Sequence, residues 1–182
     1  MKKRMISAVL TLAVVISVFA AYAPQAKAFT QFGPYDLGNI TWTVVVDTGG
    51  ATGTLTISRR AGVTTNVAMQ NYSAGSRPPW YVHSAQVTRI VIDDSITGLG
   101  TWSTGIGSWA FADFTRVTSV VIPADVTISS IGADAFRGCA ALRGFYLNDG
   151  FTPPVQRDFT AALTIGDNAF NSCGSLDRKS VV

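Results

Sequence analysis

The stretch Ile106-Gly107-Ser108-Trp109-Ala110-Phe111 decides the fold, because its pattern returns twice further along the chain. The second copy is Ile131-Gly132-Ala133-Asp134-Ala135-Phe136, and the third is Ile165-Gly166-Asp167-Asn168-Ala169-Phe170. All three follow Ile-Gly-x-x-Ala-Phe. Such self-similarity is typical of chains that stack small units, none of which can bury its apolar side chains alone. The motif therefore predicts a repeat architecture in which these residues form the core and not a functional site.

A short strand is predicted before each copy of the motif. The strand patterns are Val87-x-x-Ile90-x-Ile92, Val117-x-x-Val120-x-Ile122 and Leu142-x-x-Phe145-x-Leu147. Side chains alternate along a strand, so Ile90 and Ile92 should face the core while Arg89 and Val91 face solvent. The unit starts at Val87, Val117, Leu142 and Leu176 lie 30, 25 and 34 residues apart, which places insertions in the connections.

The block from Val117 to Leu142 resembles a complete repeat of the BspA-like leucine-rich repeats of bacterial surface proteins. Asn39–Trp42, Gly53–Ser58 and Pro79-Trp80 resemble the segment that leads into such arrays, so the resemblance covers roughly residues 39 to 176. It implies an α/β repeat, a leucine-rich-repeat solenoid of mainly short parallel strands. Ala and Phe of each motif would form a short helical turn after the Gly, and the three Phe rings would stack into a spine.

Four segments are predicted along the chain. Residues 1–28 form a signal peptide, 29–85 an N-terminal β-rich cap, 86–176 three repeats with the start of a fourth, and 177–182 a non-native tail. Within the cap, Ile40–Val46 and Thr54–Ser58 should form a β-hairpin around Gly49-Gly50. This hairpin would cover the open apolar end of the first repeat, which a solenoid requires.

The first 28 residues have the organisation of a targeting signal. A basic start is followed by an apolar run from Ile6 to Ala23, by Pro24, and by Ala26-Lys27-Ala28 as a cleavage site. We expect a mature chain that begins at Phe29 and is secreted or held at the cell surface, with no membrane contact beyond the signal peptide. Because the apolar run is long, an uncleaved membrane anchor is the alternative.

The overall charge of +3 does not indicate an anionic partner. Four of the 14 basic residues lie in the signal segment, which leaves ten against 11 acidic residues after it. The mature chain is therefore nearly neutral, and neither nucleic acid nor an anionic membrane is predicted as a partner.

The repeat pattern fails after Leu176. Asp177-Arg178-Lys179-Ser180-Val181-Val182 puts Lys179 where a core residue belongs, and this hexapeptide can be encoded by a sequence that resembles a sequencing adapter. Our hypothesis is that the gene is cut at this point and that the repeats continue in the native protein.

Residues able to carry chemistry are few. Cys139 and Cys173 occupy the same place in consecutive units, about 4.8 Å apart in a stack, so a disulfide and a pair of buried reduced thiols both remain open. His83 is the only histidine and is expected in a surface loop, while Asp93-Asp94 are expected in a solvated turn. No metal site, cofactor site or catalytic motif is predicted, so we expect no enzyme.

A binding surface, if present, should be the solvent face of the stacked strands. The register places Val91, Val121 and Tyr146 side by side there, flanked by Arg89 and Ser119. A row of exposed apolar and aromatic side chains can bind a partner. The alternative is that β-branched residues and Tyr simply suit strands.

These patterns predict a non-catalytic interaction or adhesion module that binds a protein or glycan ligand at the cell surface, as the family resemblance implies. The alternative is the targeting region of an exported enzyme whose catalytic domain lies outside this chain. The sequence predicts neither the ligand nor the oligomeric state.

Overall fold

The computed structural model describes residues 28–64, 69–93, 102–124, 126–147, 155–156 and 163–177, with main chain only at 102–104. The expected signal peptide and tail therefore lie almost wholly outside the described residues. Nine strands and one 3-10 helix make up these ranges: β1 Phe29–Leu37, β2 Ile40–Asp47, β3 Gly53–Arg59, η1 Pro79–His83, β4 Arg89–Asp93, β5 Trp102–Ile106, β6 Ser119–Val121, β7 Val126–Ile131, β8 Gly144–Tyr146 and β9 Thr164–Ile165. None of the described residues forms a helix long and apolar enough for a membrane span.

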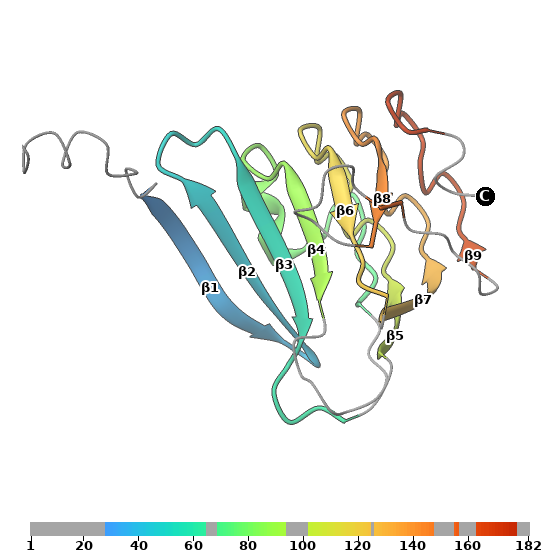
Figure 1. Ribbon diagram of the computed structural model, residues 1–182. Coiled ribbons are helices and arrows are strands. Elements are labelled where there is room, and N and C mark those ends of the chain that lie inside the picture. Colours follow the sequence, from blue (N-terminus) through green and yellow to red (C-terminus); the bar gives the residue numbers. More distant parts are fainter. Residues whose placement is uncertain are drawn as a thin grey trace, which may run out of the picture.

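The strands form two sheets. The larger has six strands in the order β1-β2-β3-β4-β6-β8, and Figure 1 shows them side by side. Its first three strands are antiparallel neighbours, whereas β3-β4, β4-β6 and β6-β8 are parallel pairs. The smaller sheet has the order β5-β7-β9 and is parallel. Each repeat thus supplies one strand to each sheet, and its Ile-Gly-x-x-Ala-Phe segment begins at the last residue of the strand in the smaller sheet.

The expected fold class, an α/β leucine-rich-repeat solenoid with helical turns, is wrong, although the hairpin expected before it is present as β2 and β3. The described residues contain no α-helix, and the large sheet is mixed. We call residues 106–113, 131–138 and 165–172 the first, second and third turn. In each turn the fourth residue is left-handed, with φ of 58° at Trp109, 56° at Asp134 and 56° at Asn168. A right-handed helix cannot continue through such a residue.

A second left-handed residue lies two positions after each Phe, at Asp113, Gly138 and Ser172. Because of this alternation, every second N–H group points to the neighbouring turn, whereas Ala110, Ala135 and Ala169 donate back to the Gly of their own turn. Trp109, Phe111 and Asp113 of the first turn donate to Ala133, Ala135 and Arg137 of the second, over 2.7 to 3.1 Å. Part of the backbone hydrogen bonding that a helix would keep internal therefore joins one turn to the next.

The motif glycines are required by close approach. Gly107, Gly132 and Gly166 do not have a positive φ. A Cβ at Gly132 would collide with the backbone of Gly107 and Ser108 in the preceding turn, and Gly166 meets Gly132 and Ala133 in the same way. Stacked backbones thus lie too close for any side chain at this position.

The core lies on the inner side of the large sheet. Alternate residues of β2, β3 and β4 are buried there, including Ile90 and Ile92, as the alternation predicts. The predicted Phe spine is present, since Phe111 and Phe136 stack at 5.3 Å and Phe136 and Phe170 at 5.6 Å between ring centroids. Trp80 extends this row at 6.2 Å from Phe111, and its indole N–H donates to the Ala110 carbonyl.

Candidate functional site

The five residues predicted to form a binding surface lie on the outer face of the large sheet. Val91 of β4 is paired with Val121 of β6, which is paired in turn with Tyr146 of β8. Arg89 is paired with Ser119 in the neighbouring row. The structure therefore brings these residues together in the predicted register.

Their exposure differs from the expectation at one position. Val121 is only 4% exposed, whereas the other four residues are half-buried. Val121 lies on a central strand between Val91 and Tyr146, so neighbouring side chains shield it on both sides. The Val121 side chain is therefore covered by its neighbours and does not offer apolar area to a partner.

The outer face continues across the antiparallel strands β2 and β3, which were predicted only as part of a cap. The row of Val91 extends to Thr56 and Thr43, and the row of Arg89 extends to Thr54 and Val45. A third row joins Asp93, Ser58 and Thr41. The alternation of hydroxyl and apolar residues in Ile40–Thr43 and Gly53–Ser58 was the signal that could have revealed these rows.

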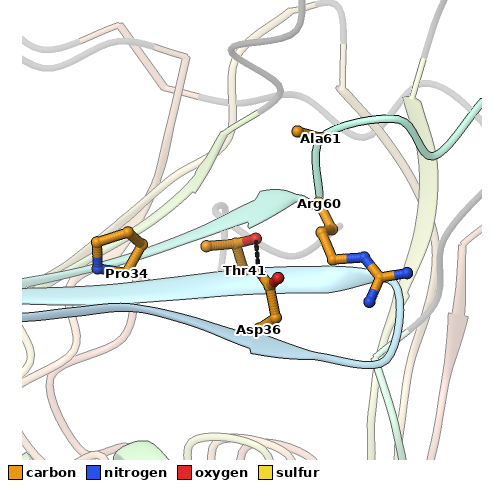
Figure 2. Close-up of a pocket in the computed structure, with 5 residues that line it drawn as sticks. All are labelled: Pro34, Asp36, Thr41, Arg60 and Ala61. Atoms are coloured by element: carbon orange, nitrogen blue, oxygen red, sulfur yellow. Dashed lines mark hydrogen bonds between the residues drawn. The ribbon is translucent and has the colours of Figure 1, made fainter.

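An open pocket of about 640 Å³ lies on this face at the end of the β1-β2 hairpin. Its lining residues are Pro34, Asp36, Thr41, Arg60 and Ala61 (Figure 2). Asp36 and Thr41 are paired across the hairpin, and the Thr41 hydroxyl donates to the Asp36 carboxylate over 2.7 Å. The backbone N–H of Arg60 donates to Asn39, which fixes the start of the loop that carries the guanidinium.

The pocket therefore offers one anionic and one cationic side chain next to a hydroxyl. Such a group can orient a polar ligand through hydrogen bonds and ionic contacts. The sequence did not predict the pocket, because Arg60 is brought next to the β1-β2 hairpin only by the pairing of β2 with β3.

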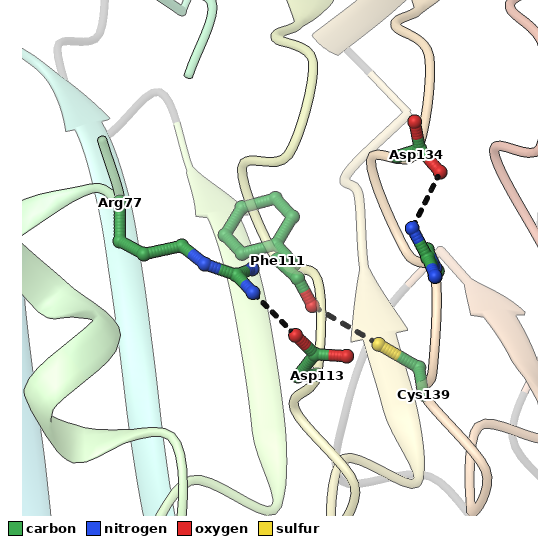
Figure 3. A network of polar contacts seen from close by, with 6 residues as sticks. Arg77, Phe111, Asp113, Asp134 and Cys139 are labelled. Carbon is green, nitrogen blue, oxygen red and sulfur yellow. Dashed lines mark hydrogen bonds and ion pairs between the residues drawn. The ribbon is translucent and has the colours of Figure 1, made fainter. Parts of the chain in front are cut away.

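A second polar cluster lies at the turns (Figure 3). The Arg77 guanidinium lies over the rings of Tyr81 and Trp109, at 4.7 and 4.8 Å from their centroids, and forms an ion pair of 2.6 Å with Asp113. Arg137 lies 5.3 Å from the Trp109 centroid and 3.7 Å from Asp134. Each cation already has a carboxylate and a ring, so this cluster holds the turns together.

The two cysteines are free thiols in the structure. The Cys139 thiol donates to the Phe111 carbonyl and the Cys173 thiol to the Phe136 carbonyl, each over 3.1 Å (Figure 3 shows the first). Burial raises the pKa of both thiols above its ordinary value. Because the thiolate is the reactive form, this arrangement does not make a nucleophile.

The other candidate groups occupy structural positions. His83 ends η1 and is half-buried, with its ring 4.4 Å from the Phe32 ring and its Nδ1 3.2 Å from the Gln86 side chain, so the expected surface loop is wrong. Asp93 is the last residue of β4, and Asp94 lies outside the described residues. Within the described ranges, no three His, Cys or acidic side chains gather in a way that could hold a metal ion.

Comparison of the chain with protein-family models, with curated proteins and with solved structures finds no match.

Proposed function

We propose that this protein is an exported, non-catalytic interaction module that binds a protein or glycan ligand at the cell surface through the outer face of its large sheet. The observation that carries the proposal is the register of the outward side chains, whose longest row runs from Thr43 of β2 to Tyr146 of β8. Export rests on the organisation of residues 1–28.

The chemistry of the rows suits recognition of a polar ligand. Hydroxyls of Thr43, Thr54, Thr56 and Ser119 lie among apolar and charged groups, and the pocket at Asp36 lies at one end of the face. Hydroxyl groups both donate and accept hydrogen bonds, so they can match the polar groups of sugars or of a peptide backbone. Strands hold these groups more rigidly than loops, which lowers the entropy lost on binding.

The proposal is tested with the purified chain on arrays of glycans and extracellular-matrix proteins. The face variant carries Thr56→Arg and Ser119→Arg, and the control carries Val82→Arg, since Val82 is 78% exposed and lies in η1. Val121 is left unchanged because it is buried. Melting curves verify that both variants fold.

We expect at least one array component to be retained by the native chain and by the control, and its affinity to fall about tenfold or more in the face variant. Retention that is equal in both variants would remove the outer face from consideration. The absence of any retained component would contradict the proposed function as a whole.

A further inference from the structure

The pocket at the end of the β1-β2 hairpin holds two opposite charges that do not pair with each other. Asp36 and Arg60 both line it, yet among the described residues no ion pair joins them and the Arg60 guanidinium has no hydrogen-bond partner. Figure 2 shows the guanidinium apart from the carboxylate, and the only dashed line joins Asp36 to Thr41. Both charges are therefore available to a ligand.

The backbone fixes the places from which these side chains extend. The Arg60 N–H donates to the Asn39 carbonyl over 2.9 Å, and the Arg60 carbonyl accepts from the Val63 N–H over 3.1 Å. On the hairpin, Asp36 of β1 is paired with Thr41 of β2. Because paired strands and a closed turn hold these groups before a ligand arrives, less entropy is lost on binding.

The hydrogen-bonding groups that remain open define the chemistry of a ligand. The Thr41 hydroxyl donates to Asp36 Oδ1, so Asp36 Oδ2 and the Thr41 oxygen remain as acceptors within the described part of the chain. The Arg60 guanidinium offers N–H donors in a planar fork that matches a carboxylate. Pro34 and Ala61 add apolar surface. A matching ligand carries a carboxylate, several hydroxyl donors close to it, and a C–H face.

We propose that this pocket binds a carboxylate-bearing sugar at the end of an oligosaccharide, either a sialic acid or a hexuronic acid. Arg60 donates paired hydrogen bonds to the sugar carboxylate, Asp36 accepts from the sugar hydroxyls, and the Pro34 ring lies against a C–H face of the sugar. The inference rests on the proposed function, because the pocket belongs to the same outer face and the inference names the ligand class.

The charges around the pocket favour a single acidic sugar over a polyanion. The row of Asp36 and Thr41 continues across the sheet to Ser58 and Asp93, so an oligosaccharide that extends from the pocket meets hydroxyl and carboxylate groups. After residue 28 the chain has ten basic and 11 acidic residues, which leaves no excess positive charge to attract a polyanion. Neutral sugars should therefore follow the acidic one.

An amino acid or a peptide terminus matches the pocket less well. A free amino acid could place its ammonium group at Asp36 and its carboxylate at Arg60, but it would fill only a small part of about 640 Å³. A peptide C-terminus supplies the carboxylate with one backbone N–H beside it, whereas a sugar supplies several hydroxyl donors. Both are retained as competing probes.

The test uses the purified full chain and NMR titrations. The probes are sialyllactose, lactose extended by a terminal glucuronic acid, unmodified lactose, glycine, and a tetrapeptide with a free C-terminus. Arg60→Gln removes the positive charge of the pocket, and Asp36→Ala removes its anionic acceptor. Arg143→Gln is the matched control, because Arg143 is exposed and precedes β8 at the opposite edge of the large sheet. Melting curves verify that the variants fold.

We expect at least one acidic oligosaccharide to bind with a Kd below about 5 mM, and lactose to bind about tenfold more weakly or not at all. The tighter of the two acidic probes identifies the kind of acidic sugar. Arg60→Gln should lower the affinity about tenfold or more and Asp36→Ala about threefold or more, whereas Arg143→Gln should leave it unchanged. Equal binding of lactose, tighter binding of glycine or the tetrapeptide, or an affinity that Arg60→Gln does not change would overturn the inference.

Failure of this inference can be told apart from failure of the proposed function. If neither acidic oligosaccharide binds, but array components are retained and lose affinity in the Thr56→Arg, Ser119→Arg variant, the outer face is a binding surface and the assignment of the pocket is wrong. If neither the array nor the titrations show binding, both proposals are wrong.

Discussion

Replacing Phe136 by Ala tests the stacked core most directly. The Phe136 ring is fully buried and lies between Phe111 and Phe170, at 5.3 and 5.6 Å between centroids. It also meets Phe145 edge-to-face at 5.5 Å. A buried Phe→Ala change costs about 3–5 kcal/mol, and each aromatic pair contributes about 0.5–1.5 kcal/mol beyond its buried area. Because three aromatic pairs are lost, we expect the free energy of unfolding to fall by an amount at the upper end of this range, about 4–5 kcal/mol.

For a folded unit of about 150 residues, each kcal/mol lowers the melting temperature by about 2–4 °C, so we expect a drop of about 8–20 °C. Circular dichroism during heating measures it. Phe170→Ala should lower the melting temperature less, because Phe170 is only partly buried. Val82→Ala should change the melting temperature little, because Val82 is 78% exposed. If Phe136→Ala shifts the melting temperature no more than Val82→Ala does, the assignment of the core is refuted.

Two further substitution experiments follow from the turns. Gly132→Val should destabilise the fold by about 1–3 kcal/mol in urea titrations, since its Cβ would collide with Gly107 and Ser108, whereas Gly49→Val should be neutral because nothing lies within 4 Å of its added Cβ; equal midpoints would contradict the close approach. Cys139 and Cys173 should resist Ellman's reagent at neutral pH until the chain unfolds, because burial raises both thiol pKa values. The folded state then keeps protons that the unfolded state releases above about pH 8.5, so stability should fall as pH rises through that value, and the fall should be smaller in a Cys139→Ala, Cys173→Ala variant; an unchanged pH slope would argue against thiol burial.

Periodicity alone predicted much of the core. Alternation in β4 identified Ile90 and Ile92 as buried, and the threefold motif identified the Phe spine. The register of Val91, Val121 and Tyr146 also followed, because equivalent positions in successive repeats pair in parallel strands. These features depend only on which side chains are apolar and how often they recur, and both can be counted in a sequence.

The parts that were missed depend on backbone conformation and on pairing between distant segments. β1 was not predicted because Gly33 and Pro34 interrupt its pattern, and in the structure an irregular register between Phe32 and Tyr35 absorbs them. β7 was not predicted either, although Val126–Ile131 pairs with β5 and β9 to form the second sheet. Local pattern cannot reveal a partner strand that is itself too short or irregular to be recognised.

The prediction of helical turns was wrong, and the residue at the fourth position of two of the three motifs gives the reason. Asp134 and Asn168 occupy the left-handed position, and Asp and Asn tolerate that conformation better than most residues. Trp109 occupies the same position but does not share this tolerance, so the three motifs do not consistently predict a left-handed residue there. In the structure its ring lies beside Arg77 and Arg137, which supplies contacts that an Asp or Asn at this place would lack.

Those contacts show how the N-terminal residues and the repeats depend on each other. Arg77 joins the segment before η1 to the first turn through Trp109 and Asp113, and Trp80 is hydrogen-bonded to Ala110. On the sheet, β3 is paired along its length with β4, so backbone hydrogen bonds cross from the hairpin to the first repeat. A binding face that runs from β2 to β8 needs this continuity, because rows of side chains remain in register only where the strands beneath them are paired. The scaffold and the proposed binding surface are therefore set by the same hydrogen bonds.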